Sequence, residues 1–71
     1  MIRVREGIDI LAMLGSCGFT TYVLRKNKIF SESSIQRLRK GGLPSWAELD
    51  FICKTLNYDI GEIVEFVDDR D

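Results

Sequence analysis

Histidine is absent from the 71-residue sequence, which holds only two cysteines and one proline. Without histidine, nucleophilic catalysis of the Ser-His or Cys-His kind lacks its usual general base. Cys17 and Cys53 cannot complete a four-ligand zinc site by themselves, and no glycine-rich phosphate-binding loop is present. We therefore expect no enzymatic activity, no metal, no cofactor and no small-molecule ligand. Both cysteines lie among apolar residues, so we expect buried, reduced thiols.

A long apolar stretch is missing as well. The run without a charge that begins at Ile10 and ends before Arg25 is interrupted by Gly, Ser and Thr. A membrane-spanning helix needs about 20 consecutive apolar residues. The first six residues hold no apolar segment after their basic side chains, so we expect no secretory signal and a cytoplasmic protein. A chain of this length has room for one domain, residues 1–71, and its small core favours dimerisation.

The charges are strongly segregated along the chain, although the net charge is only −1. Residues 1–19 are neutral overall, and residues 20–45 hold six basic side chains and one acidic one. Residues 46–71 hold two basic side chains and eight acidic ones. A basic middle segment of this kind favours binding to a polyanion such as a nucleic acid. The alternative is that the charges only solvate the surfaces of helices.

Apolar spacing and capping residues predict a mainly helical chain. Ile2–Arg5 alternates apolar and charged side chains, which predicts an extended arm or an edge strand paired with residues 66–67. Five helices are expected: from Ile8 to Gly15 or Gly18, from Thr20 or Thr21 through Leu24, from an N-cap at Ser31 to Gly41, from a capping box at Ser45 to Leu56, and from a capping box at Asp59 through Val64. The predicted fold class is all-α, with a short strand pair at the ends.

The apolar positions of these helices predict one shared core. It is expected to contain Ile10, Leu14, Leu24, Ile35, Leu38, Leu49, Ile52 and Leu56. The helical spacing of four aromatic residues assigns them to core or dimer packing rather than to a surface for single-stranded nucleic acid: Trp46, Phe51, Tyr58 and Phe66. Residues 60–67 hold more apolar side chains than one short helix can bury. They could pack on the first helix or form a homodimer interface, and we expect a mixed role.

Residues 20–41 combine a short amphipathic helix, a tight apolar turn and a second helix with one exposed polar face. This is the layout of a helix-turn-helix motif. In the second helix only Ile35 and Leu38 point inward. The polar face, at positions i, i+3, i+4 and i+7, consists of Ser33, Gln36, Arg37 and Lys40. Arginine can bond to guanine, glutamine to adenine, and Glu32 in the first turn can accept a bond from cytosine. The motif therefore predicts binding in the major groove of duplex DNA.

Thr20–Gly41 resembles the helix-turn-helix of small Cro-like, phage-repressor (XRE-type) regulators. The stretch LDFICKTLNYDIGEIVEF, residues 49–66, is similar to the LDxIC…LNCxxGDILEYVPD ending of one subgroup of stand-alone regulators. The resemblance covers nearly the whole chain, from Ile2 to Asp69. It implies a five-helix repressor-like fold, sequence-specific binding to duplex DNA, and often a homodimer on a palindromic operator.

The resemblance also implies roles for residues by position. Leu24, Ile35 and Leu38 match the packing residues between the two motif helices. The base-contacting positions are matched by Glu32, Ser33, Gln36 and Arg37. Thr21 and Lys40 match phosphate contacts. Helix ends and basic side chains around the motif complete the set of candidate phosphate contacts with Lys28, Ser31 and Arg39.

The turn departs from the family pattern. Arg25 stands where the family usually has a small residue, and Ile29 stands where it usually has glycine with a positive φ. A β-branched residue resists positive φ. We therefore expect Asn27 to be the left-handed residue, or the turn to be longer than usual. Lys28 replaces an apolar position and is expected to extend outward.

The sequence thus predicts a small transcriptional repressor that binds duplex DNA through its third helix, as a homodimer. The alternative is a protein-interaction module that keeps the repressor fold but has lost operator recognition. The sequence pI near 5.3 and the acidic Glu32 in the recognition helix favour this alternative.

Overall fold

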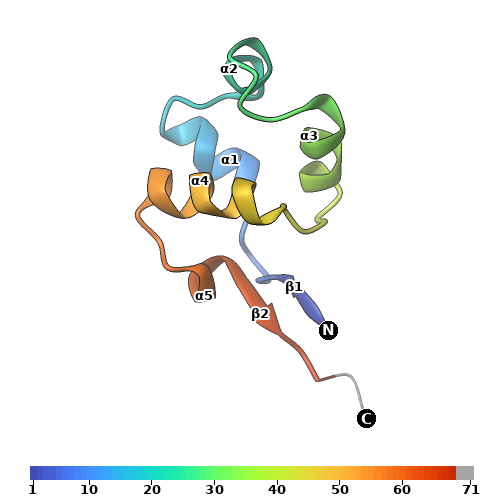
Figure 1. Ribbon diagram of the computed structural model, residues 1–71. Helices are drawn as coiled ribbons and strands as arrows, with labels where there is room; N and C mark the ends of the chain where they lie inside the picture. Colours follow the sequence, from blue (N-terminus) through green and yellow to red (C-terminus); the bar gives the residue numbers. More distant parts are fainter. Residues whose placement is uncertain (69–71) are drawn as a thin grey trace.

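The computed structural model describes residues 1–68, and residues 69–71 lie outside the described part. The chain forms a short strand, five helices and a second short strand (Figure 1). Their bounds are β1 Ile2–Val4, α1 Ile10–Ser16, α2 Thr21–Lys26, α3 Glu32–Arg39, α4 Trp46–Leu56, α5 Ile60–Ile63 and β2 Val64–Phe66. Figure 1 shows α2 at one end of the domain and the two strands with α5 at the opposite end. The predicted five-helix fold with a terminal strand pair is confirmed.

Side-chain caps fix where the helices begin. The hydroxyl groups of Thr20, Ser31 and Ser45 each accept a hydrogen bond from the backbone N–H three residues later, at 3.2–3.3 Å. Such caps satisfy donors that have no partner within the helix. Thr20, rather than Thr21, is therefore the N-cap of α2. The first helix starts two residues later than Ile8, because the Asp9 carboxylate accepts from the N–H of Ala12 at 3.2 Å.

Left-handed glycines fix where two of the helices end. Gly18 after α1 has φ +93°, and Gly41 after α3 has φ +82°. In each case the residue after the glycine donates its N–H back into the last turn, Phe19 to Leu14 at 2.9 Å and Gly42 to Arg37 at 2.8 Å. This pattern is the Schellman motif. The sequence-based assignment of both helix ends is confirmed.

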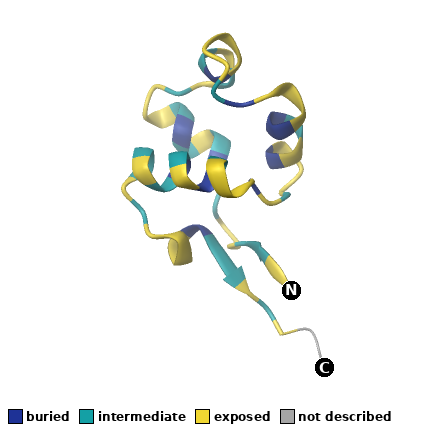
Figure 2. Cartoon of the chain, in the orientation of Figure 1, coloured by how far each residue is buried: buried dark blue, intermediate teal, exposed yellow. Residues whose placement is uncertain are grey.

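One core holds the five helices together (Figure 2). Its buried members are Ile10, Leu14, Leu24, Phe30, Ile35, Leu38, Leu49, Ile52 and Ile63. Seven of the eight predicted core residues are among them, and Leu56 is only half-buried because it ends α4 at the edge of the domain. Phe30 and Ile63 were not predicted. Phe30 lies in the turn between α2 and α3, where helical periodicity carries no information about burial.

Of the four aromatic residues assigned to packing, Phe51 and Tyr58 are half-buried and pack against the core. The Phe51 ring meets Phe19 and Phe30 edge to face, with ring centroids 5.3 and 5.7 Å apart. Phe66 is 70% exposed and is not a core residue, and the core alternative is also wrong for Trp46, because 79% of it is exposed. It is the first residue of α4, and side chains in a helix lean toward its N-terminus, so Trp46 projects past the core.

The prediction of two buried thiols is also wrong in part. Cys17 is exposed and Cys53 is half-buried, and both are free thiols. Cys17 follows the last residue of α1 as its C-cap, so it no longer shares the buried face of that helix. For Cys53, burial is the main cause that raises the pKa of the thiol, and Asp50, Asp59 and Glu62 add to it.

Antiparallel pairing of β1 with β2 brings the two ends of the chain together. Ile2 lies opposite Phe66, and Val4 lies opposite Val64, so the strand pair includes the predicted Phe66 and extends back to residue 64. On the other face of the pair, Glu65 bonds to Arg3 at 3.0 Å and to Arg5 at 3.3 Å. Arg3 and Arg5 are therefore engaged within the domain, at the far end from α2.

Burial of Leu38 leads to a first prediction. Leu38→Ala removes a buried side chain of α3 and leaves a cavity, so we expect a loss of about 2–5 kcal/mol in the free energy of unfolding. This loss is comparable to the whole stability of a small domain. Chemical denaturation followed by circular dichroism measures it. Tyr22→Ala, at a residue 66% exposed, is the control and should cost less than about 0.5 kcal/mol. Equal midpoints for the two variants would contradict the core assignment.

Candidate nucleic-acid interface

Helix α3 is held on the domain by one face and presents the other to solvent. Ser34, Ile35 and Leu38 are its buried residues. With 3.6 residues per turn, the direction opposite to these three residues is occupied by Ser33, Gln36 and Lys40. Glu32, Arg37 and Arg39 flank this outward stripe. Ser33, Lys40 and the three flanking residues are exposed, and Gln36 is half-buried.

The turn before α3 takes a shape that the sequence did not reveal. Lys28 has φ +55°, whereas Asn27 has φ −90°, so the expectation that Asn27 is left-handed is wrong. The N–H of Ile29 donates to the carbonyl of Leu24 at 2.9 Å, and that of Lys28 donates to Arg25 at 3.1 Å. These two bonds form a Schellman motif in which a lysine takes the place of the usual glycine. Five residues, 27–31, connect α2 to α3, and Lys28 is exposed, as expected.

Glu32 is engaged by side chains from both motif helices. Its carboxylate forms an ion pair with the Nε atom of Arg25 on α2, and Arg25 Nη2 donates a second bond at 3.2 Å. Gln36 Nε2, one turn further along α3, donates to the same carboxylate at 3.1 Å. These hydrogen bonds, from Arg25 first and Gln36 second, hold the pKa of Glu32 below its ordinary value. The carboxylate therefore links α2 to α3 and stays charged.

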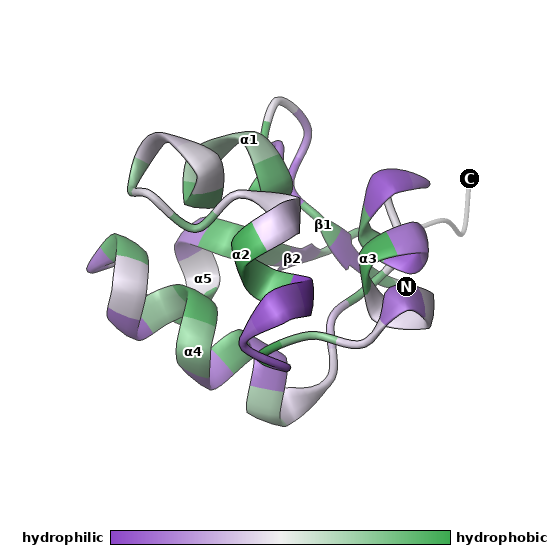
Figure 3. Ribbon diagram, turned by 90° about the horizontal axis from the view of Figure 1, so that it is seen from above, coloured by the Kyte–Doolittle hydropathy of each residue, from purple (hydrophilic) through white to green (hydrophobic). Residues whose placement is uncertain are grey.

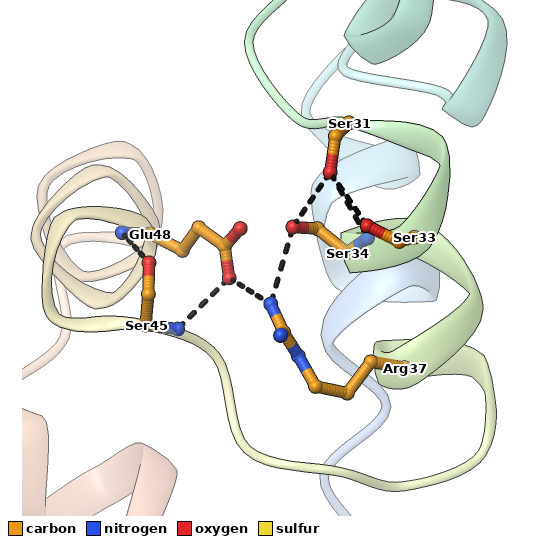
Figure 4. Close-up of polar contacts among 6 residues, drawn as sticks. All are labelled: Ser31, Ser33, Ser34, Arg37, Ser45 and Glu48. Atoms are coloured by element: carbon orange, nitrogen blue, oxygen red, sulfur yellow. Dashed lines mark hydrogen bonds and ion pairs between the residues drawn. The ribbon is translucent and has the colours of Figure 1, made fainter.

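Arg37 turns from the flank of α3 toward α4 (Figure 4). Its Nη2 atom donates to the hydroxyl of Ser34 and to Glu48 Oε1, both at 3.1 Å. The same Glu48 oxygen accepts the backbone N–H of Ser45 at 2.8 Å and completes the capping box of α4. Partial burial raises the pKa of Glu48, but Ser34, the Ser45 N–H and Arg37 together outweigh it, so the pKa lies below the ordinary value.

The five candidate phosphate contacts lie around α2, the turn and the end of α3. Thr21 is the first residue of α2 and is half-buried. Ser31 Oγ already accepts the N–H of Ser34 and lies within 3.2 Å of the hydroxyls of Ser33 and Ser34. Lys28, Arg39 and Lys40 are exposed, and none of them has an ion-pair partner within residues 1–68. Figure 3 shows hydrophilic residues at the end of α2 and along α3.

The sequence did not reveal the two hydrogen-bond partners of Arg37, which are the buried Ser34 and the acidic Glu48. Ser34 lies three residues before Arg37 on α3, a spacing at which helical side chains meet. Glu48 was recognised only as half of a capping box. In the part of the chain that the structure describes, no cluster of His, Cys, Asp or Glu could hold a metal ion. No helix within residues 1–68 is long and apolar enough to cross a membrane.

Two capped helices joined by a tight turn, the second with an outward polar stripe, define a helix-turn-helix domain. The model of the Cro/C1-type HTH DNA-binding domain family matches residues 9–69, so the chain belongs to this family. No curated protein and no solved structure matches the chain. The family match confirms the resemblance to Cro-like regulators that the sequence motifs carry. The chain is a DNA-binding domain of the kind found in transcription regulators.

The environment of Glu48 leads to a prediction about pH. Because its pKa is lower in the folded state than the ordinary 4.5, the ionised carboxylate stabilises the fold above that value, and the stabilisation is lost as the pH falls through the folded pKa. Glu48→Gln keeps an acceptor for Ser45 but has no charge to lose. Between pH 6 and pH 3 the parent protein should therefore lose about 1 kcal/mol more stability than this variant. Urea unfolding at each pH measures the difference, and parallel pH profiles would contradict it.

Proposed function

We propose that this protein is a sequence-specific transcriptional repressor that inserts α3 into the major groove of duplex DNA. The observation that carries the proposal is the outward stripe of α3, which lies opposite the buried Ile35 and Leu38. The major groove, about 12 Å wide, admits one α-helix and presents a distinct pattern of donors and acceptors for each base pair. A domain bound to an operator that overlaps a promoter represses by occupying it.

Ser33 and Gln36 are the first candidates for base contacts, because they lie near the centre of the stripe. The Gln36 amide can bond bidentately to adenine, and the short Ser33 side chain lets the helix backbone approach the base edges. Glu32 and Arg37, the other two predicted base contacts, are both occupied by ion pairs in the DNA-free protein. They reach a base only if those pairs open.

The proposed phosphate contacts lie on either side of this stripe. Thr21 lies at the N-terminus of α2, where unpaired backbone N–H groups favour an anion. Lys28 and Ser31 precede α3, and Arg39 and Lys40 end it, so the five residues bracket the recognition helix. Contacts of this type orient a protein on the duplex without reading its sequence.

The two roles respond differently to mutation. Gln36→Ala should cost about 1–3 kcal/mol on the preferred duplex and relax the preference at one base pair. Lys40→Ala should weaken binding to all duplexes alike and lower the dependence of log K on log salt by about one. Gel shifts on the DNA upstream of the coding region and on scrambled DNA, at two salt concentrations, measure both effects. If the parent protein ignores duplex DNA even at low salt, the protein-interaction alternative replaces the repressor.

The proposed protein partner is a second copy of the chain. It is expected to bind near the strands and the start of α4, away from α2. Five exposed apolar residues gather there, and we name them the apolar face: Ile2, Leu43, Trp46, Ile60 and Phe66. The first four line an open groove of about 420 Å³, and Phe66 pairs with Ile2 across the strands. Trp46 and Phe66, 79% and 70% exposed, present about 300 Å² of aromatic surface. An exposed apolar patch of this size is comparable to the largest patch on a typical single domain, and such patches often mark binding surfaces.

The sheet adds a second element that suits a symmetric partner. Met1 and Val67 exchange both of their backbone hydrogen bonds, at 2.6 and 2.7 Å. The alternate residues Ile2 and Phe66 therefore direct their N–H and C=O groups away from the partner strand. Two copies related by a two-fold axis can cover both apolar faces and keep two α3 helices available for a palindromic site. The strands and α5, which carry Ile2, Ile60 and Phe66 of the apolar face, lie at the opposite end of the domain from α2, so a partner there leaves the N-terminus of α2 uncovered.

Dimerisation through the apolar face is testable by mass. The parent protein should sediment near twice 8.1 kDa at micromolar concentration. Trp46→Asp and Phe66→Asp place a charge in the interface and should shift the protein toward the monomer without unfolding it. Tyr22→Asp, at an aromatic residue of α2 that is 66% exposed, is the matched control and should remain dimeric. A parent mass of 8.1 kDa at all concentrations would remove the dimer from the proposal.

A further inference from the structure

Of the four predicted base contacts, Arg37 is the one whose surroundings fit that role least. Arg37 lies between the exposed Ser33 and Lys40 on one side and the buried Ser34 on the other, so it stands where the exposed face of α3 meets the packed face. We propose that Arg37 is a positioning residue, which sets the orientation of α3 through Glu48 and Ser34 and does not read a base. This inference rests on the proposed function, since it concerns how the recognition helix is held.

The ion pair has one exposed end and one covered end. The Arg37 side chain is 46% exposed, whereas the Glu48 side chain is only 13% exposed. If Arg37 turned outward to reach a guanine, the covered Glu48 carboxylate would lose its counter-charge, and the buried Ser34 hydroxyl would lose a donor. An uncompensated, partly covered charge is unfavourable. A base contact by Arg37 therefore requires breaking its ion pair with Glu48, whereas Ser33 and Lys40 can contact DNA without breaking an ion pair.

Gly42, shortly after the end of α3, leaves space for the Arg37 side chain to extend toward Glu48. A Cβ atom added at Gly42 would lie 2.7 Å from Cγ of Arg37 and 3.0 Å from its carbonyl oxygen. Cγ is close to the backbone, so the arginine cannot relieve this contact without moving its whole stem. The absence of a side chain at position 42 therefore allows Arg37 to run beneath the loop to Glu48.

The contact joins two elements that both pack on α1. Helices α3 and α4 each lie against α1, and the Arg37–Glu48 pair adds a direct polar link between them (Figure 4). Because Glu48 also accepts the Ser45 N–H, the link ends at the first turn of α4. A rotation of α3 about its own axis would break this link. The pair therefore fixes the direction in which Ser33 and Gln36 face the groove.

Glu48→Gln separates positioning from base reading, because the two roles predict opposite results. If Arg37 positions α3, removing the Glu48 charge weakens binding to the preferred duplex by about tenfold. If Arg37 reads a base, the same variant releases the arginine, and binding is unchanged or tighter. Glu62→Gln, the same change in the α5 cap, is the matched control and should bind like the parent. The preferred duplex is obtained by selection from a random pool with the parent protein.

A second comparison uses the base-pair preference. Arg37→Ala should reduce the preference at several base pairs together, and Gly42→Ala should reproduce this pattern although residue 42 carries no group that could read a base. Loss of preference at a single base pair in Arg37→Ala, with Gly42→Ala and Glu48→Gln unaffected, would overturn the inference. Thermal unfolding of each variant verifies that the binding assay is done on folded protein.

The inference also has a readout that needs no DNA. If the parent protein binds no duplex, the proposed function fails, and amide hydrogen exchange of α3 then decides the positioning role. Glu48→Gln should speed exchange in α3 more than Glu62→Gln does. Equal exchange in the two variants would overturn the positioning role by itself.

Discussion

The structure depends on five fully buried side chains, one from each helix, that meet in a single core. Leu14, Leu24, Ile35, Ile52 and Ile63 all have 0% exposure. Helices of four to eleven residues are unstable by themselves in water, because nucleation costs more than so few hydrogen bonds return. Each helix is therefore stabilised by the apolar side chains that it buries in the shared core. The same constraint fixes which face of α3 is turned to solvent, since Ile35 cannot leave the core.

Local signals in the sequence were sufficient to predict where most of the helices begin and end. Caps at Ser31 and Ser45 and the left-handed glycines at positions 18 and 41 act within five residues, so they can be read without any tertiary information. The left-handed Lys28 could not be read in this way. The Schellman bonds to Leu24 and Arg25 place the positive φ one residue beyond Asn27, and the burial of Leu24 outweighs the cost of that conformation for lysine.

For the candidate interface, periodicity predicted the directions of side chains but not their partners. Ser33 and Gln36 follow from helix phase alone, since the buried Ile35 and Leu38 define the opposite side. The ion pairs of Arg25 and Arg37 join residues 7 and 11 positions apart, beyond the range in which one helix relates its side chains. Counting charges therefore overstates the basic surface, because two of the arginines are neutralised by carboxylates within the fold.

The pairing of β1 with β2 has a consequence for how the chain folds and opens. Arg3 and Glu65 are 62 positions apart, so the strand pair closes a loop that contains all five helices. Closing so long a loop carries an entropic cost that the helical core does not share, since its neighbouring helices are joined by short turns. We infer that the helices assemble first and the strands join last. The strands should also be the first segment to separate in the native protein, and their separation would divide the apolar face by moving Ile2 away from Trp46 and Ile60.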